Sequence, residues 1–231
     1  MSGRPIVTID GPSGAGKSTV SRLLAERTSL VRLDTGAMYR GVAWAARKAG
    51  VPWSDGSALG RICGTLRMEF RAEGGDQKLV LDGEDVSAAI RTPEISMGAS
   101  EVSSHGSVRE AMVALQRKMG EAGGVVLEGR DIGTVVFPEA DVKFFLDAHA
   151  AVRALRRYRE WGPGPGRGYE EVFREVLRRD IQDSTREHSP LRVPDGAIRI
   201  DSTVLTVGEV VEEMMRHLPA PADRPTGKAG R

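Results

Sequence analysis

The amino-acid sequence predicts an α/β fold, in which a parallel β-sheet carries helices on both of its faces. Short apolar and β-branched runs alternate along the chain with longer stretches of helical periodicity, as in parallel sheets covered by helices. The first run, Ile6–Asp10, leads directly into a glycine-rich loop and then into a helical stretch. The length of 231 residues fits one large domain, or one domain that carries an insertion.

The elements follow from this alternation in chain order. The strands expected in the sheet cover residues 6–10, 30–33, 125–128, 142–146 and 197–200. The helices expected to pack on it cover residues 17–27, 37–48, 93–103, 107–119, 149–161, 169–187 and 206–217. Apolar side chains recur at helical spacing in these stretches, as Val20, Leu23 and Leu24 do in the first. Gly50 and Pro52 end the second helix.

Residues 60–90 interrupt the alternation. Residues 66–71 alternate apolar and polar side chains, and residues 78–81 form a second short apolar run. Gly74-Gly75 and Asp82-Gly83 are typical of tight turns between antiparallel strands. This segment therefore predicts a small antiparallel insertion.

Two further segments lack the pattern of regular structure. Residues 162–168 consist almost entirely of glycine and proline and are expected to be irregular. Residues 219–231 are rich in proline, alanine and glycine and are expected to form a disordered tail. We therefore expect one structural unit over residues 1–218.

The composition excludes several classes of protein. The formal net charge is +1, which disfavours a protein that binds nucleic acid through a broadly basic surface. No run approaches 18 apolar residues, and the first ten residues resemble a strand rather than a signal peptide. The single cysteine, Cys63, excludes an internal disulfide and suits a reducing compartment. We expect a cytoplasmic monomer with neither a membrane nor a nucleic acid as partner.

The strongest motif is a phosphate-binding loop. Residues 11–18 satisfy the pattern G-x-x-x-x-G-K-[ST], with a predicted strand before them and a predicted helix after them. Glycines let the backbone N–H groups turn towards a phosphate chain, and the helix directs the positive end of its dipole at the same anion. The candidate ATP-binding residues are Gly11, Pro12, Ser13, Gly14, Ala15, Gly16, Lys17, Ser18 and Thr19.

Two residues of this loop have specific expected roles. Lys17 is expected to reach the terminal phosphates, and the Ser18 hydroxyl is expected to ligate Mg²⁺. The alternative is a glycine-rich turn with an incidental lysine, which the aligned strand, loop and helix disfavour. The sequence therefore predicts a protein that binds a nucleoside triphosphate.

Two polar segments each follow a predicted strand. Residues 34–40 contain Arg40, and residues 129–134 contain Arg130 and Asp131. Because the carboxyl ends of parallel strands share one edge, where ligands bind in open sheets, these segments are expected to lie together. One such arginine alone is more simply explained as a surface charge or an ion pair with its neighbouring aspartate. Two at one edge predict a site for a second phosphorylated molecule.

A cluster of arginines precedes the segment 162–168. Arg153, Arg156 and Arg157 share a face of the expected helix. Arginines beside an irregular segment suit a lid that closes over the transferring phosphates and excludes water. The alternative is a solvated charged face with Glu160 as a partner.

A second cluster lies further along the chain, where Arg179, Asp183 and Arg186 share one helix face. Glutamates at 170, 171 and 175 could pair with these arginines, so the cluster by itself is a weak indication of a ligand site.

Together these pieces resemble the bacterial cytidylate kinases, a family of nucleoside-monophosphate kinases that phosphorylate CMP and dCMP. The matching stretches are IDGPSGAGKST (9–19), LDTGAMYR (33–40), LDGEDVSAAIRTPEI (81–95), EGRDIGTVVFPEADVKFFLDA (128–148) and DSTVLTVGEVVE (201–212). The resemblance implies a phosphate-loop nucleoside-monophosphate kinase fold in a single kinase unit. Within it, the monophosphate-binding insertion is expected at about 37–105 and a helical lid at about 150–187.

The resemblance also implies roles for individual residues. Arg40 and Arg130 would hold the phosphate of CMP. The implied contacts to cytosine are Ser100, Arg109, Asp131 and Arg186, and those to the sugar are Arg179 and Asp183. Thr35 stands where the family often has serine beside the substrate. The implied catalytic residues are Lys17, Arg130, Arg153, Arg156 and Arg157.

The chemistry of the bases agrees with this assignment. Cytosine offers an amino donor at N4, for which the carboxylate of Asp131 is a fitting acceptor, whereas uracil presents an oxygen there. A site built to bond a polar group rejects an analogue that lacks it. The expected reaction is ATP + CMP ⇌ ADP + CDP, and it needs no general base because a phosphate monoester is mostly ionised at neutral pH.

Two other functions stay open at this point. A phosphate-loop kinase for a small-molecule hydroxyl would need a carboxylate base, for which Asp34 or Asp131 could serve. A non-catalytic nucleotide-binding regulator would need Lys17 but not the arginines of a second site.

Overall fold

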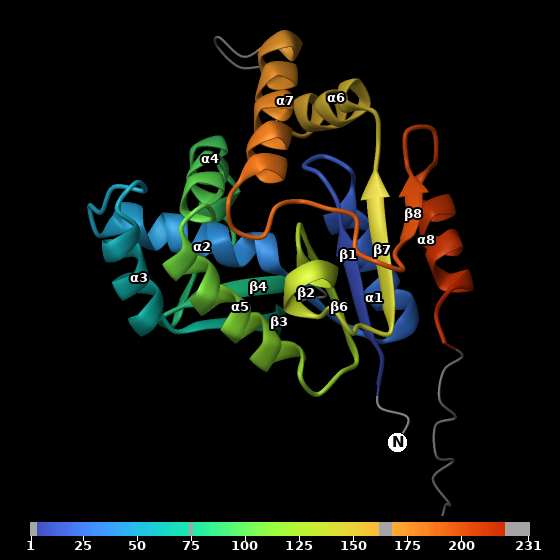
Figure 1. Ribbon diagram of the computed structural model, residues 1–231, viewed down its shortest axis with the longest axis horizontal. Coiled ribbons are helices and arrows are strands. Elements are labelled where there is room, and N and C mark those ends of the chain that lie inside the picture. Colours follow the sequence, from blue (N-terminus) through green and yellow to red (C-terminus); the bar gives the residue numbers. More distant parts are fainter. Residues whose placement is uncertain (1–3, 74–75, 162–167, 220–231) are drawn as a thin grey trace, which may run out of the picture.

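The computed structural model describes residues 4–73, 76–161 and 168–219 (Figure 1). Its central sheet is formed by β1 (Ile6–Asp10), β2 (Val31–Asp34), β6 (Val125–Gly129), β7 (Val142–Asp147) and β8 (Ile198–Asp201). These strands are parallel and lie in the order β2-β6-β1-β7-β8. The segments after β1, β2 and β6 therefore all open at the same edge of the sheet, as predicted.

Helices cover the sheet and extend beyond it. They are α1 (Lys17–Thr28), α2 (Thr35–Lys48), α3 (Gly56–Thr65), α4 (Pro93–Val102), α5 (Gly106–Gly120), α6 (Ala150–Trp161), α7 (Tyr169–Thr185) and α8 (Val207–Arg216). Two short helices span Ala89–Arg91 and Ile132–Val136, the second with π-helical geometry. One apolar core joins α1 and α8 to β1 and β7 through Leu24, Val211, Ile9 and Phe144. This arrangement confirms the predicted fold class.

A second core lies in the predicted insertion. The strands β3 (Met68–Glu73), β4 (Asp76–Leu81) and β5 (Glu84–Asp85) form the expected antiparallel sheet. Met38, Leu59, Leu79 and Ile95 join it to the surrounding helices. These elements and α2 to α4 fall largely within the range 37–105, whereas α5 begins at Gly106, just beyond it. That boundary and the unit 1–218 stay predictions.

Helix α3 was not predicted. Its glycines at positions 56, 60 and 64 lower the helix propensity of the segment. The structure forms the helix nonetheless, because Asp55 caps its first turn by accepting a hydrogen bond from Ala58 N at 2.9 Å and because Leu59 is fully buried. Gly60 also lies close to Ser107 of α5, so the small residue serves packing between the two helices.

Helices α6 and α7 lie beyond the carboxyl ends of the strands, above the arrowhead of β7 in Figure 1. They occupy most of the range 150–187 assigned to a lid. The glycine- and proline-rich segment between them, apart from Gly168, and the tail from residue 220 lie outside the described residues. Among the helices that are described, none combines the length and apolar character needed to cross a membrane.

Gly11 fixes the phosphate-binding loop against the sheet. Its φ is +149°, which L side chains rarely adopt, and a Cβ at this position would lie 1.9 Å from the backbone oxygen of Leu146 in β7. The loop can leave β1 along this path because the residue has no side chain.

We therefore expect Gly11→Ala to lower the free energy of unfolding by about 3 kcal/mol or more, since backbone rather than a side chain must move. Gly208→Ala is the matched control, because its Cβ would meet no atom closer than Thr206 Oγ1 at 4.0 Å. That control is expected to be neutral or stabilising by up to about 1 kcal/mol. Thermal and chemical unfolding of both variants measure the difference, and equal losses would contradict the interpretation.

Candidate functional site

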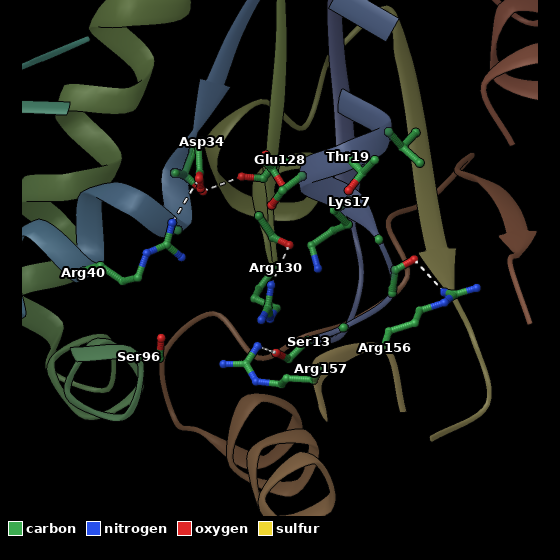
Figure 2. A pocket seen from close by; sticks show the side chains of 18 of the residues that line it. Ser13, Lys17, Thr19, Asp34, Arg40, Ser96, Glu128, Arg130, Arg156 and Arg157 are labelled. Atoms are coloured by element: carbon green, nitrogen blue, oxygen red, sulfur yellow. Dashed lines mark hydrogen bonds and ion pairs between the residues drawn. The ribbon is translucent and has the colours of Figure 1, made fainter. Parts of the chain in front are cut away.

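One cleft of about 810 Å³ opens at the carboxyl edge of the parallel sheet. It extends from the phosphate-binding loop, past the ends of β2 and β6, to α4 of the insertion, and α6 and α7 line its outer side. Its volume suits a small-molecule site, and its position is where open parallel sheets bind ligands. Figure 2 shows the cleft with many of its lining side chains.

The phosphate-binding loop leaves the amino end of α1 available to an anion. Gly16 occupies the N-cap position in a left-handed conformation, and no side chain caps the helix. The Nζ atom of Lys17 donates to Gly11 O and Pro12 O, both at 2.7 Å. Burial lowers the pKa of Lys17, and the nearby charge of Arg130 lowers it further. The negative charge of a bound phosphate would oppose both effects by favouring the charged form of the lysine.

A buried carboxylate supports Ser18. Ser18 donates its hydroxyl proton to Glu128 Oε2 at 2.7 Å, and Ser21 donates to Glu128 Oε1 at 2.9 Å. Glu128 is 3% exposed and is the next-to-last residue of β6. This contact leaves the lone pairs of the Ser18 oxygen for another partner. The sequence analysis missed Glu128, although a single acidic residue at the end of an apolar strand is a usable signal.

Four arginines from different elements meet across the cleft from Lys17. They are Arg40 of α2, Arg130 after β6, Arg157 of α6 and Arg179 of α7. Figure 2 shows Arg130 and Arg157 near the centre, with Arg40 on the side of the insertion. Arg40 Nη2 lies 3.0 Å from Asp34 Oδ2, and Arg130 Nε lies 2.8 Å from Asp183 Oδ2.

The cations in this group are crowded. Burial, with neighbouring arginines adding to it, lowers the pKa of Arg157 to about 10 and that of Arg179 to about 9. Asp183 and Glu160 are nearby and act in the opposite direction, but they do not restore the ordinary pKa values. The cleft therefore holds an excess of positive charge suited to anionic ligands.

The end of the cleft near α5 is built around Asp131. Arg109 donates to Asp131 Oδ2, and Arg186 Nη2 lies 3.6 Å from Asp131 Oδ1. Asp131 and Arg109 are 4% and 3% exposed. The guanidinium of Arg109 also stands over the ring of Tyr39, 5.6 Å from its centre. Each carboxylate oxygen has two lone pairs, so Asp131 keeps capacity for a further donor.

Buried polar atoms without a hydrogen bond concentrate in these two regions. Within the described part of the chain they include Arg40 Nε, Ser100 Oγ, Arg109 Nε, Arg179 Nε and Arg186 Nη2. Native proteins rarely leave such atoms unsatisfied, because their burial costs free energy. Their grouping around one cleft indicates that a polar ligand supplies the missing partners.

Two of the predicted lid arginines are engaged by the protein itself. Arg153 is 5% exposed, donates to Ser13 O at 3.1 Å and forms a two-point ion pair with Asp180 at 2.9 and 2.6 Å. Arg156 donates to Ser202 O at 2.5 Å and to Ser202 Oγ at 3.0 Å, at the end of β8. Arg157 donates to Ser13 Oγ at 3.1 Å and lines the cleft, which Arg153 does not.

Thr35 and Ser100, both expected beside the substrate, differ in their position relative to the cleft. Thr35 lines the cleft, but its hydroxyl donates to Glu128 O at 2.6 Å. Ser100 of α4 is not among the residues that line the cleft. Ser96 of the same helix lies directly at the cleft, as Figure 2 shows. The sequence analysis missed Ser96, although its i, i+4 spacing to Ser100 was visible.

Residues near the start of α8 extend the cleft beyond the phosphate-binding loop. Leu205, Thr206, Val207 and Val210 line it there, beside Arg156. Apolar side chains next to a phosphate site suit the flat ring of a nucleotide base. They lie within the stretch 201–212 that carried the resemblance, but no role was assigned to them.

Asp10 aligns the two halves of the site. This buried carboxylate at the end of β1 accepts hydrogen bonds from Ile132 N at 2.8 Å and Gly133 N at 2.7 Å. Burial raises the pKa of Asp10 to about 6, against the effect of these bonds. The contacts fix the segment that carries Arg130 and Asp131 relative to the phosphate-binding loop.

Comparison with known proteins gives a consistent result. The family model described as cytidylate kinase matches residues 7–220. Cytidylate kinase of Syntrophotalea carbinolica is 51% identical over 217 residues, which cover 94% of this chain and 92% of that protein. Cytidylate kinase of Geobacter sp. strain M21 is 50% identical over 212 residues, which cover 91% of each chain.

A solved structure shares the fold at low sequence identity. The crystal structure of an uncharacterized protein from Eubacterium ventriosum aligns with a TM-score of 0.50 and 11% identity, over 93% of this chain and 98% of that one. At this identity the likeness concerns the fold alone.

The geometry predicts that Arg153 contributes mainly to the stability of the fold and Arg157 mainly to turnover. Arg153→Met breaks a two-point ion pair and is expected to lower the free energy of unfolding by about 3 kcal/mol. Arg157→Met removes a cation whose pKa is already lowered, so stability is expected to change by less than about 1 kcal/mol while turnover falls at least about tenfold. Thermal unfolding and steady-state rates of both variants test this, and the reverse pattern would exchange the two roles.

Proposed function

The chain belongs to the cytidylate kinase family, and we propose that it transfers the γ-phosphoryl group of ATP to CMP or dCMP, with ADP and CDP or dCDP as products. The observation that carries the proposal is a single cleft that joins a phosphate-binding loop to a second group of arginines and to a buried carboxylate. Such a cleft suits two phosphorylated molecules, one of which has a base with an amino donor.

On the donor side, the triphosphate lies along Gly11 to Thr19. The backbone N–H groups of the loop and the uncapped end of α1 bind its phosphates. Lys17 leaves its two backbone acceptors and binds the terminal phosphates. The donor base lies beside Leu205, Val207 and Arg156, where the cleft is partly apolar.

Magnesium fits the oxygen ligands at Ser18. Mg²⁺ in phosphate sites takes one or two protein oxygens and completes its shell with phosphate and water. The described residues hold no group of three or more histidine, cysteine, aspartate or glutamate side chains that would form a protein cage for a metal. Ser18 would be the ligand and Glu128 would orient it, and the ion would neutralise charge on the transferring phosphates.

On the acceptor side, Arg40 and Arg130 hold the phosphate of CMP. Asp34 and Asp183 keep these two arginines in place through the ion pairs described above. Arg179 and Asp183 hold the sugar. Asp131, positioned by Arg109 and Arg186, accepts from the amino group of cytosine, and Ser100 lies near the base.

The chemical step requires no base from the protein. An oxygen of the CMP phosphate bonds to the γ-phosphorus of ATP as the bond to the β–γ bridging oxygen breaks and ADP leaves. The acceptor phosphate is mostly ionised at neutral pH, because its second pKa is near ~6. Lys17, Arg130 and Arg157 stabilise the charge of the transition state, and α6 and α7 close over it to exclude water.

Transfer to a small-molecule hydroxyl is not favoured. Such a reaction needs a carboxylate base, and Asp34 and Asp131 are both paired with arginines. Burial alone would raise the pKa of Asp34, but Arg40 and Arg32 hold it below the usual value, which makes a weaker base. A regulator without catalysis would not need the second group of arginines.

We also propose a cytoplasmic monomer without nucleic acid as a partner. The near-zero net charge and the single cysteine, which has no disulfide partner within the chain, support this.

The function is tested by assaying the protein with ATP, Mg²⁺ and each of CMP, dCMP, UMP and AMP. We expect CMP or dCMP to give the highest kcat/KM, and Lys17→Ala to reduce turnover at least about a hundredfold while the protein stays folded. ADP release is the measurement, and circular dichroism checks the fold. Near-normal turnover of Lys17→Ala, or equal rates with and without a monophosphate, would contradict the mechanism.

Arg130 and Asp131 are adjacent but serve different parts of the acceptor. Arg130→Met is expected to weaken CMP and UMP alike, since a phosphate carries no base identity. Asp131→Asn is expected to lower the CMP/UMP ratio of kcat/KM by about ten- to a hundredfold, because cytosine loses a charged acceptor for its amino group while the new amide can donate to O4 of uracil. Steady-state kinetics with both nucleotides measure the ratio. An equal loss for both substrates in Asp131→Asn would mean that the carboxylate merely orients arginines.

A further inference from the structure

Arg32 of β2 stands between the two halves of the cleft. It is not part of the phosphate-binding loop, and none of the roles assigned above to acceptor residues falls on it. Its side chain is 16% exposed and lines the cleft wall between Glu128 and Asp34. Glu128 accepts a hydrogen bond from Ser18 on the donor side, and Asp34 pairs with Arg40 on the acceptor side.

The contact on the donor side is short. Arg32 Nη2 lies 2.5 Å from Glu128 Oε1, and Arg32 Nε lies 2.9 Å from Ser21 Oγ. Glu128 Oε2, the other oxygen of the same carboxylate, accepts from Ser18 at 2.7 Å. Arg32 therefore holds one oxygen of Glu128, which turns the other towards the loop residue proposed to ligate Mg²⁺.

The contact on the acceptor side runs through Asp34. Arg32 Nη2 lies 3.6 Å from Asp34 Oδ2, and the same oxygen lies 3.0 Å from Arg40 Nη2. Arg32 shares the charge of Asp34, which would otherwise act on Arg40 alone. Asp34 then cancels less of the field of Arg40, and more of that field acts on the phosphate of the acceptor.

The insertion is joined to the same residue. The side-chain amide of Gln77, on β4, donates to the backbone oxygen of Arg32. Gln77 also lines the cleft, and its Oε1 is one of the buried atoms without a hydrogen-bond partner among the described residues. The small sheet therefore contacts the main sheet at the position where the two carboxylates are bridged.

We propose that Arg32 is a positioning residue that couples the magnesium side of the site to the phosphate-binding arginine of the acceptor side. Its guanidinium keeps Glu128 oriented on Ser18 and relieves Arg40 of part of the charge of Asp34. The proposal rests on the function proposed above, because it assigns the acceptor phosphate to Arg40. A residue that bridges two carboxylates only to stabilise the fold would leave both ligand affinities unchanged.

The test uses Arg32→Leu and Arg32→Lys in the full chain. Affinity for CMP is measured by calorimetry without ATP or Mg²⁺, and the Mg²⁺ concentration for half-maximal rate is measured separately. Arg32→Leu is expected to weaken CMP binding about fivefold or more and to raise the required Mg²⁺ about threefold or more. Lysine keeps the charge but cannot bridge two carboxylates with a planar fork, so intermediate values are expected.

Arg47→Leu is the matched control. Arg47 is an exposed arginine that forms a single ion pair with Glu94, at 2.5 Å, on the outside of the insertion. Its loss removes the same charge from the protein without touching the cleft, so both measurements are expected to match the unaltered protein.

A double-mutant cycle tests the route to Arg40. Asp34→Asn keeps a side chain that can cap α2 but removes the charge that Arg32 and Arg40 share. In this background, Arg32→Leu is expected to change CMP affinity by less than about twofold. If the fold-changes in CMP affinity caused by Arg32→Leu and Asp34→Asn instead multiply in the double variant, Arg32 does not act on Arg40 through Asp34.

The outcomes separate this inference from the proposed function. A lower melting temperature of Arg32→Leu with unchanged CMP affinity and Mg²⁺ requirement would overturn the inference. A change in only one of these two quantities would overturn it as well. If Arg32→Leu does not fold, Arg32→Lys decides by the same two measurements. Failure of the unaltered protein to bind and phosphorylate CMP would instead overturn the proposed function.

Discussion

The cleft holds more positive charge than its own carboxylates neutralise, and much of the structure serves to keep these cations in place. Charges of one sign repel at short range in a partly buried site, so the folded chain must hold them there. Most of these cations have one anionic neighbour. Arg40 is paired with Asp34, and Arg130 is paired with Asp183. The carboxylates fix the directions of the arginines, and the remaining charge attracts the substrates.

Helix α6 combines arginines that support the fold with an arginine that is proposed to bind the ligand. Arg153, Arg156 and Arg157 are close in sequence and face the same region. Arg153 and Arg156 donate to backbone oxygens of the surrounding frame, whereas Arg157 donates to the Ser13 hydroxyl and also lines the cleft. Arg153 connects the phosphate-binding loop to Asp180 of α7, one residue after Arg179 and three before Asp183. The donor loop and the helix proposed to bind the sugar are thus joined through one buried guanidinium.

The sequence was sufficient for the parallel sheet, the phosphate-binding loop and the antiparallel insertion, because each has a local pattern of hydrophobicity or glycine spacing. It was not sufficient for α3, where tertiary packing of Leu59 and the Asp55 cap override three glycines. Nor could it show which arginines line the cleft, since Arg153 and Arg157 lie on the same face of one predicted helix and, of the two, only Arg157 lines it. Arg32 became visible as a residue of the cleft only once β2 and β6 were paired side by side.

The uncapped start of α1 has a consequence for the protein as a whole. A helix normally satisfies its first N–H groups with a side chain, and here Gly16 provides none. In the proposed mechanism the phosphates of the donor take that role, so that nucleotide binding completes the helix. A ligand that binds the folded chain alone stabilises it by about 2.7 kcal/mol at a hundred times its Kd. Where ATP is abundant, the resistance of this protein to unfolding and proteolysis is then partly a property of its substrate supply.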